Sequence, residues 1–415
     1  MKVLSLFDGM SCALLTMQGA DIPVERYVAY EIDKYAIQTA QHNFPNIEQK
    51  GDVFKADFTE FKGFDYLMGG SPCTYWSIAQ NNNRETEASG QGWELFMQYV
   101  RALREAEPKY FVYENNKSMS KAIRESITET FGFEPICINS ALVSAQNRPR
   151  LYWVGKRNAD GTYSKVEIEQ PEDRKIVLKD LLECGECWRG KSYCIDANYY
   201  KGGNFTGFKK QSGSRLMVAE SVAINTTDDD KSQTIKAQYH KNSVANFVGY
   251  TSTYGATRVA ETVRVGALPH SNGEVSKSQS AQIYSVIGKS TTLCANGGGA
   301  GAKTGLYAIP VEFTGDKPLK SVSCTDGKEY TVYEVKDGLI TIKDKQYPIK
   351  LADGFYIIRK LTVRECMRLQ TVPEWYEFPV SDTQAYKMLG NGWTVEVIIW
   401  LLQHTKEKKG NNYEY

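Results

Sequence analysis

Short apolar runs of strand length alternate with segments of helical spacing along the first part of the chain. Most of these runs are followed at once by glycine or an acidic residue, as expected where a buried strand ends in a turn. The runs predicted as strands are 3–7, 26–30, 64–68, 109–113, 137–139 and 151–155, and the segments predicted as helices are 12–17, 93–100 and 122–131. This alternation predicts a doubly wound, mostly parallel α/β sheet.

The pattern changes after about residue 184, where short β-like runs and many glycines replace the helical spacing. Two alternating runs across Asp337–Gly338 predict a hairpin. Helical spacing then returns, with a capped helix from Thr362 and a further helix over 395–402. The predicted domains are a catalytic and cofactor-binding domain of residues 1–183 plus 356–405, an inserted strand- and loop-rich domain of residues 184–355, and a polar tail of residues 406–415.

The bulk composition is that of a globular protein with more than one domain. The 415 residues exceed the usual size of one domain, and 41% of them are hydrophobic. No apolar run approaches the roughly 18 residues that a membrane helix needs, so a cytoplasmic protein without a membrane partner is expected. Nine scattered cysteines favour reduced thiols. Cys184 and Cys187 have CxxC spacing but lack a second pair of ligands, so no metal site is predicted.

The formal net charge of +1 conceals a basic region in the inserted domain. Residues 201–300 carry eleven Lys and Arg against six Asp and Glu, and they are rich in small polar side chains. Basic side chains neutralise phosphates and short polar ones reach base edges, so this composition suits a nucleic acid. A solvated, loop-rich insert has the same composition, and composition alone supports the two interpretations equally.

Acidic residues follow three successive extended stretches. The turn Asp8–Gly9 opens into a helix, Glu31 ends the second strand, and Asp52 lies beyond the third stretch. A strand, a glycine turn and a helix form a common cofactor-binding layout, and a carboxylate at the end of the second strand suits the hydroxyls of a ribose. Each acid by itself is more often a cap or a surface charge. Together they predict a nucleoside pocket.

Cys73 closes the turn Gly69–Cys73, just beyond the predicted strand 64–68. A single cysteine is more often a small core residue than a nucleophile. Glu114 ends the next predicted strand, however, and becomes a neighbour of Cys73 if the two strands pair in parallel. The sequence therefore predicts a thiol and a carboxyl group at one edge of the sheet.

Two further segments carry polar groups towards the same edge. Arg148 and Arg150 flank Pro149 directly before a predicted strand. In an extended segment their side chains point the same way and form a compact anion clamp, whereas the alternative is a pair of surface arginines. The turn Gly390–Gly392 separates two C-terminal helices and can present backbone amides and the Asn391 amide to a cofactor.

Six short motifs occur in order from one end of the chain to the other. They are Phe7-Asp8-Gly9, Gly69-Gly70-Ser71-Pro72-Cys73, Glu114-Asn115, Gln146-x-Arg148-x-Arg150, Arg364-x-x-x-Arg368-Leu369-Gln370 and Gly390-Asn391. In these motifs and in their order the chain resembles the C5-cytosine DNA methyltransferases of bacterial or phage type. The departures from the family pattern remove no reacting group and lie at Ser71, Thr74, Asn116 and Gly392.

The resemblance implies a Rossmann-like methyltransferase fold and double-stranded DNA as the partner of a monomer, in the cytoplasm of a bacterium or of a phage-infected cell. Cys73 would add to C6 of a cytosine flipped out of the helix, and Glu114 would bind or protonate its N3. Arg150, and less directly Arg148, would bind the base carbonyl or a phosphate. The inserted domain would recognise the target.

The resemblance also implies S-adenosylmethionine as methyl donor, with S-adenosylhomocysteine as product. Glu31 would bind the ribose and Asp52 the adenine edge. The implied cofactor-binding residues are Phe7, Asp8, Gly9, Glu31, Asp52, Pro72, Asn391 and Gly392.

Three other functions fit part of the pattern. Some relatives with these motifs modify tRNA, although the large insert favours DNA. A non-catalytic nucleic-acid-binding relative would have no need of Cys73 and Glu114. A nicotinamide-dependent oxidoreductase would accept Glu31, but Asp8-Gly9-Met10 lacks the G-x-G-x-x-G of such enzymes.

Overall fold

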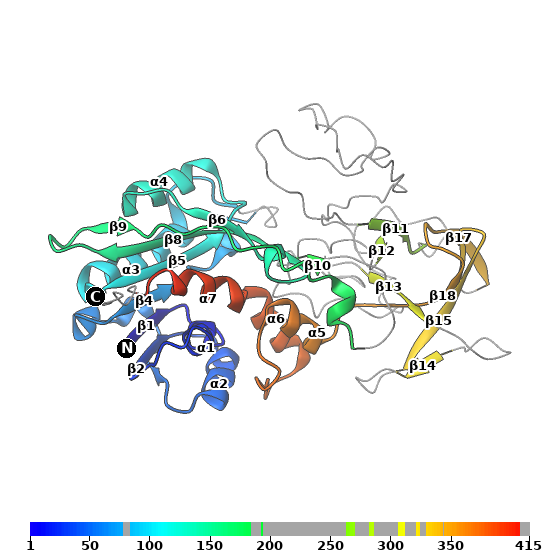
Figure 1. Ribbon diagram of the computed structural model, residues 1–415, viewed down its shortest axis with the longest axis horizontal. Coiled ribbons are helices and arrows are strands. Elements are labelled where there is room, and N and C mark those ends of the chain that lie inside the picture. The colour runs from blue at the N-terminus through cyan, green and yellow to red at the C-terminus, as the bar shows by residue number, and fades with distance from the viewer. Residues whose placement is uncertain are drawn as a thin grey trace, which may run out of the picture.

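The described part of the computed structural model contains two eight-stranded β-sheets, with helices around the first of them (Figure 1), and one two-stranded sheet. The described residues are 1–77, 84–183, 192–193, 263–269, 282–285, 306–311, 321–323, 329–342 and 344–406. Most of the basic stretch 201–300, the CxxC cysteines and the tail beyond Lys406 therefore lie outside the described residues.

The first sheet has the strand order β3-β2-β1-β4-β5-β8-β6, and β9 pairs with β8. Its strands are β1 (Lys2–Leu6), β2 (Arg26–Tyr30), β3 (Glu48–Gln49), β4 (Tyr66–Gly69), β5 (Tyr110–Asn116), β6 (Ile136–Asn139), β8 (Pro149–Arg157) and β9 (Tyr163–Lys165). From β3 to β5 all neighbours are parallel, whereas β8 is antiparallel to β5, β6 and β9. The predicted α/β sheet is confirmed, with an antiparallel portion beyond β5.

Helices cover both faces of this sheet, as a doubly wound fold requires (Figure 1). Adjacent residues of β5 show the alternation, because Phe111 packs with one core cluster and Val112 with the other. The cluster around Phe111 includes α3 (Gly90–Ala106) and α4 (Lys121–Phe131). The cluster around Val112 includes α1 (Cys12–Gly19), α2 (Lys34–Asn43) and α7 (Val395–Gln403).

The strand order reverses at β1, which lies between β2 and β4. The chain builds outward from β1 to β3 and then returns to the other side of β1 with β4. In open α/β sheets ligands bind outside the carboxyl ends of the strands at such a switch point. The fold therefore directs attention to the turns that follow β1 and β4.

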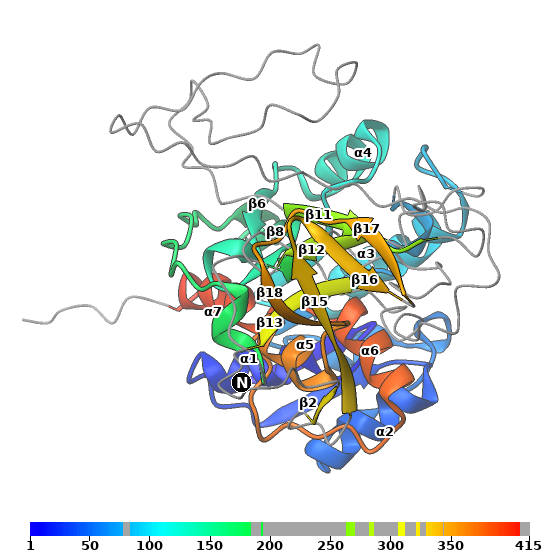
Figure 2. The ribbon, with the colours of Figure 1, turned by 90° about the vertical axis from the view of Figure 1, so that its right-hand side faces the viewer.

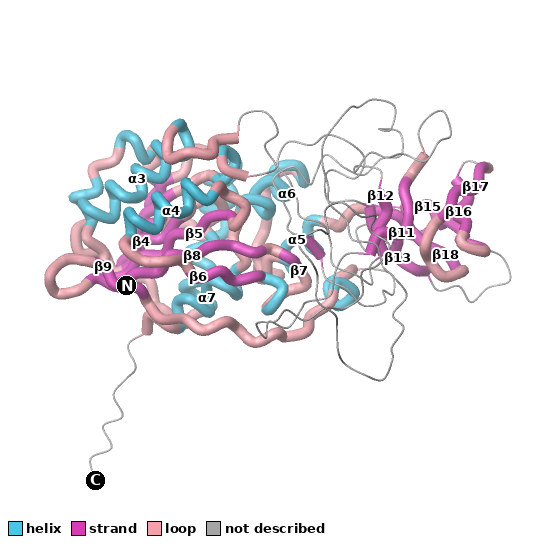
Figure 3. Tube along the Cα trace, turned by 90° about the horizontal axis from the view of Figure 1, so that it is seen from above, coloured by secondary structure: helices cyan, strands magenta, loops and turns pink. Residues whose placement is uncertain are grey.

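The second sheet has the order β11-β12-β13-β18-β15-β16-β17, and β14 pairs with β15. Figure 2 turns this sheet towards the viewer, and Figure 3 shows the two sheets at opposite ends of the molecule. Tyr307 and Ile357 on one face join the core cluster of the first sheet, while Ala308 and Ile358 pack in a separate cluster on the other face. The strands are β11 (Val263–Ala267), β12 (Gln282–Ser285), β13 (Leu306–Val311), β14 (Ser321–Ser323), β15 (Glu329–Lys336), β16 (Leu339–Ile342), β17 (Lys345–Pro348) and β18 (Gly354–Arg359).

Two predictions about this region have different outcomes. The hairpin across Asp337–Gly338 is confirmed, because β15 and β16 pair in antiparallel register and both turn residues have positive φ, 53° and 71°. The predicted boundary at residue 356 is displaced, because β18 continues to Arg359 as a strand of the second sheet. The division of the chain into domains stays a prediction.

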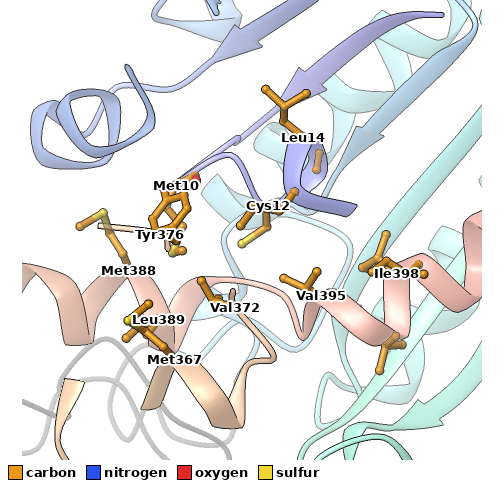
Figure 4. Close-up of a cluster of buried hydrophobic side chains, with 14 of the residues drawn as sticks. Met10, Cys12, Leu14, Met367, Val372, Tyr376, Met388, Leu389, Val395 and Ile398 are labelled. Atoms are coloured by element: carbon orange, nitrogen blue, oxygen red, sulfur yellow. Dashed lines mark hydrogen bonds between the residues drawn. The ribbon is translucent and has the colours of Figure 1, made fainter. Parts of the chain in front are cut away.

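The C-terminal segment returns to the first sheet through α5 (Val363–Leu369), α6 (Asp382–Asn391) and α7. Thr362 and Glu365 form the predicted capping box of α5. Figure 4 shows Met10 and Cys12 beside Met388 and Val395 of the returning helices. The Tyr376 hydroxyl donates to the carbonyl of Met10 at 2.7 Å, so this segment is fixed to the turn after β1.

Short strands and turns complete the described part of the chain. They comprise the strands β7 (Gln146–Asn147) and β10 (Ser192–Tyr193) and the 3-10 helices η1 (Val53–Lys55), η2 (Phe58–Phe61), η3 (Cys73–Tyr75), η4 (Ser140–Leu142) and η5 (Leu178–Leu181). Within the described residues, none of the helices has the length and apolar character needed to cross a membrane.

Candidate active site

A cavity of about 250 Å³ lies at the switch point, at the carboxyl ends of β1 and β4. Its described lining includes the predicted residues Phe7, Asp8, Gly9, Glu31, Pro72, Glu114, Arg148, Arg150, Asn391 and Gly392. Residues from both ends of the chain therefore meet at one site. A second cavity, of about 630 Å³ between α1 and α2, has no predicted site residue in its described lining.

Asp8 holds the turn between β1 and α1 from inside. Its buried carboxylate accepts hydrogen bonds from the hydroxyls of Ser5 at 2.6 Å, Ser11 at 2.5 Å and Tyr27 at 2.5 Å. Burial raises the pKa of Asp8 from 3.8 to about 6, against the opposing effect of these donors. Asp8 also lines the cavity, and its predicted contact with the cofactor stays a prediction.

Glu31 fixes the same turn from the end of β2. One carboxylate oxygen accepts the backbone N–H of Gly9 at 2.8 Å, and the other accepts the N–H groups of Ile32 and Asp33, also at 2.8 Å. Gly9 has a φ of 58°, and a Cβ built there meets no protein atom within 4 Å. The turn therefore presents open space at a position that borders the cavity.

Asp52 lies outside the described lining of the cavity, and its predicted contact with adenine stays a prediction. Its carboxylate accepts the N–H of Phe54 at 3.0 Å as the cap of η1. It lies outside the lining because of its position in the sheet. Asp52 follows the edge strand β3, which has only two residues and lies two strands away from β1.

The turn after β4 brings the backbone that leads to Cys73 against Glu114. β4 and β5 are parallel with Gly69 opposite Tyr113, as predicted. A Cβ built at Gly70 would lie 2.7 Å from the carbonyl oxygen of Glu114 and 3.0 Å from its Oε2. Cys73 begins η3 immediately afterwards, and its side chain lies outside the described part of the structure. Only glycine permits this approach at residue 70.

A buried polar cluster joins this turn to β5. The hydroxyls of Ser71 and Tyr113 are 2.7 Å apart, and the Asn115 amide donates to the Ser71 carbonyl at 3.2 Å and to the Tyr113 hydroxyl at 3.1 Å. Ser71 is one of the departures from the family pattern, where proline is common. Its hydroxyl provides a hydrogen bond that proline cannot form.

Glu114 lies within a strand and not beyond its end, which corrects the prediction. β5 continues to Asn116 because its antiparallel neighbour β8 pairs with it as far as Arg150. The Glu114 side chain is 12% exposed. Its Oε1 lies 3.0 Å from Nε of Arg150, and its Oε2 accepts the indole N–H of Trp393 at 3.1 Å. The carboxylate is therefore held from both sides at the cavity wall.

Arg148 and Arg150 do not form the predicted clamp on a single anion. Arg150 meets Glu114, whereas the buried Arg148 guanidinium donates to the carbonyl oxygens of Gly390 at 3.1 and 3.2 Å and of Gly392 at 2.7 Å. β7 ends at Asn147 and β8 begins at Pro149, so Arg148 lies between two strands. The extended segment assumed for the clamp is interrupted at this residue.

Trp393 and Gln370 are site residues that the sequence did not single out. Gln370 donates to the carbonyl of Leu389 at 2.5 Å and accepts from the Thr394 hydroxyl at 2.9 Å, which fixes both sides of the turn that carries Trp393. Gln370 belongs to one of the six motifs, and Trp393 lies two residues after another. These positions were the only signal in the sequence for a role at the site. Their partners are distant in sequence, so no local pattern reveals the contacts.

Comparison with known proteins adds to this geometry. A family model described as C-5 cytosine-specific DNA methylase matches residues 1–294 and 311–407. The orphan methyltransferase M.SPRI of Bacillus phage SPR is 26% identical, over 96% of this chain and 95% of its own length. The type II methyltransferase M.HhaI of Haemophilus parahaemolyticus is 22% identical, over 100% of this chain and 96% of its own length.

One solved structure supports the fold alone. The crystal structure of a mutant of Spodoptera frugiperda DNMT2 superposes with a TM-score of 0.50 at 14% identity, and covers 98% of this chain and 99% of that one. The family match extends over most of the chain, including all six motifs. The chain therefore belongs to the C-5 cytosine-specific DNA methylase family and is a DNA (cytosine-5) methyltransferase.

Proposed function

We propose that this enzyme methylates a cytosine that has left the DNA helix, with Cys73 as the nucleophile and Glu114 as the acid. One observation carries the proposal. The backbone that leads to Cys73 contacts Glu114 at Gly70, and the Glu114 carboxylate borders the cavity at the switch point. A thiol just beyond β4 and a carboxyl group on the neighbouring strand β5 can act on one planar base.

The chemistry follows from the electron demand of cytosine, whose C5 is a poor nucleophile. The Cys73 thiolate adds to C6, so that a carbon–sulfur bond forms and the electron pair of the C5–C6 double bond becomes available at C5. Glu114 assists by a hydrogen bond or proton at N3, which accepts the charge that the addition places on the ring. Arg150 keeps the Glu114 carboxyl group in position. Loss of the C5 proton and departure of the thiolate return Cys73 to its starting form.

The cavity fits the adenosylmethionine that this family uses. Glu31 would bind the ribose hydroxyls, the turn Phe7–Gly9 would border the cofactor, and Pro72, Asn391 and Gly392 would complete the wall. The open space beside Gly9 supports this assignment, because a side chain there would project into the site. Bound S-adenosylmethionine supplies a methyl group on a positively charged sulfur.

Base flipping follows from the position of the target base, since C6 of a cytosine stacked inside a duplex is not accessible to a thiol. We assign target recognition to the segment between residues 184 and 355. The strands β11 to β17 lie in that segment, and the second sheet packs on the core of the first through Tyr307 and Ile309. Double-stranded DNA would then lie between the cavity and the second sheet.

Replacement of the nucleophile tests the proposal most directly. We expect Cys73→Ala to abolish methyl transfer from tritiated S-adenosylmethionine to duplex DNA while DNA binding is retained. Wild-type protein should also form a denaturation-resistant complex with duplex DNA that contains 5-fluorocytosine, and Cys73→Ala should not. Methyl transfer at the wild-type rate by Cys73→Ala would exclude the proposed mechanism.

The substrate is tested by two measurements. Bisulfite sequencing of plasmid DNA from cells that express the protein should show cytosines that resist conversion in one sequence context. Competition between duplex DNA and tRNA in the tritium assay should favour DNA. If the tritium were found in the tRNA and not in the DNA, the reaction would be assigned to RNA instead.

A further inference from the structure

Each carboxylate oxygen of Glu114 has its own nitrogen partner, one in an ion pair and one in a hydrogen bond. Arg150 faces Oε1 at 3.0 Å, and the indole Nε1 of Trp393 donates to Oε2 at 3.1 Å. Trp393 and Glu114 both line the cavity. The two donors fix the plane of the carboxylate, because rotation about its terminal bond would break one of the two contacts.

The position of Trp393 depends on the turn before it. Arg148 donates to the carbonyl oxygens of Gly390 and Gly392, directly before Trp393 in the chain. Gln370 also donates to the Gly392 carbonyl, at 3.3 Å. Trp393 is 279 residues from Glu114 in sequence, and this turn is what brings the indole to it. A buried arginine thus acts on the carboxyl group through the backbone and the indole.

We propose that Trp393 is a positioning residue for the reaction, which orients Glu114 towards the cytosine, and that Arg148 supports Glu114 through Trp393. The proposal rests on the proposed function of Glu114. An indole N–H is a neutral donor, so it constrains the orientation of the carboxyl group while it adds no positive charge beside it. Arg150 alone would leave the carboxyl group free to turn about a single contact or to pair with both guanidinium nitrogens.

The test removes the indole N–H and keeps an aromatic ring. We expect Trp393→Phe to slow single-turnover methyl transfer about tenfold, the effect of losing one hydrogen bond to a charged group. The dissociation constant for S-adenosylmethionine should change less than about threefold, because the phenyl ring retains the wall of the cavity. The matched control is Trp400→Phe in α7, which removes an indole donor to the carbonyl of Glu169 in an irregular segment and should leave the rate unchanged.

Glu114→Gln separates this inference from the proposed function. If Trp393 acts through Glu114, Trp393→Phe should slow the Glu114→Gln enzyme by less than about twofold, so the two effects should not multiply. A wild-type rate in Glu114→Gln would overturn the proposed function. A slow Glu114→Gln with a normal Trp393→Phe, or a full tenfold further loss in the double variant, would overturn the role of Trp393 alone. Equal melting temperatures of the variants exclude a general loss of folding.

Discussion

The turn after β1 and the turn after β4 leave neighbouring parallel strands and border the same cavity. They are held in different ways. The first turn encloses a buried carboxylate, that of Asp8, which takes hydroxyl hydrogen bonds from Ser5 and Ser11 within three residues and from Tyr27 on β2. The second contains neutral groups and is held by β5, through the contacts of Ser71 with Tyr113 and Asn115.

The difference separates local from long-range support. Ser5, Asp8 and Ser11 lie so close in sequence that the first turn carries most of its own support, at the cost of burying a charge. The second turn takes its shape from a strand more than 40 residues later in the sequence, with partners that do not titrate near neutral pH. We therefore expect the first turn to respond to pH and the second to respond to the packing of the sheet.

The largest effect should follow Gly70→Ala. The added Cβ would lie 2.7 Å from the backbone oxygen of Glu114, which cannot move without shifting β5. A displacement of about 1 Å between reacting groups costs roughly a hundredfold in rate. We expect single-turnover methyl transfer to fall by at least that factor while S-adenosylmethionine still binds.

Gly9→Ala is the matched substitution in the first turn. Its Cβ meets no protein atom within 4 Å, but φ is 58° and the methyl group would occupy space beside the cavity. We expect weaker S-adenosylmethionine binding, measured by calorimetry, with a smaller change in the rate at saturation. If Gly70→Ala weakened cofactor binding and spared the rate, the assignment of the two turns would be reversed.

Asp8→Asn should alter the pH dependence of stability. Burial raises the pKa of Asp8 from 3.8 to about 6, so between these values the folded protein binds a proton that the unfolded chain does not. Stability from this group is present below pH 3.8 and is lost as the pH rises to about 6. The shift corresponds to a loss of roughly 3 kcal/mol at pH 7.

The measurement compares unfolding in urea for wild-type and Asp8→Asn proteins at several pH values. Other titrating groups contribute equally to both, so the difference between the two curves isolates Asp8. We expect wild-type stability to decline more steeply than that of Asp8→Asn from pH 4 to 6.5. Parallel curves of stability against pH would show that folding does not change the pKa of Asp8.

The fold was predictable because most apolar runs of the first sheet end in a recognisable turn. Leu67 and Met68 precede glycine, and Phe7 precedes Asp8–Gly9, so the hydrophobic pattern marked both the strand and the place where the chain leaves the sheet. Strand ends of a parallel sheet meet at one edge, which is why Glu114 was expected beside the turn that leads to Cys73, and both Glu114 and Gly70 of that turn line the cavity.

The remainder of the site depends on contacts that a linear pattern does not encode. Arg148 bonds to carbonyl groups 242 and 244 residues away, and neither its charge nor its neighbours in sequence distinguish a backbone ligand from an anion ligand. Trp393 has an indole that could equally have packed in the core. The length of β3 is set by its pairing with β2, at Val28 and Ala29 only, and the predicted contact of Asp52 with adenine stays a prediction.

The smallest effect should come from Ser71→Ala, which removes one neutral hydrogen bond from the second turn. The Asn115 amide would still donate to the Ser71 backbone carbonyl, so the turn should keep its path. We expect single-turnover methyl transfer to slow about threefold, in line with a neutral hydrogen bond.

Tyr113→Phe removes the other partner of this hydrogen bond and should have a similar effect on the rate. The loss of rate in the double variant should be smaller than the product of the two single losses, because both substitutions remove the contact between the Ser71 and Tyr113 hydroxyls. Tyr386→Phe is the control. It deletes a buried hydroxyl that donates to the Leu361 carbonyl at 3.0 Å and does not line the cavity, so it should leave the rate unchanged.

Neither Ser71 nor Tyr113 titrates between pH 6 and 8, so the ratio of wild-type to variant rates should stay constant over that range. A ratio that changed with pH in that range would mean that the second turn depends on a charged group after all.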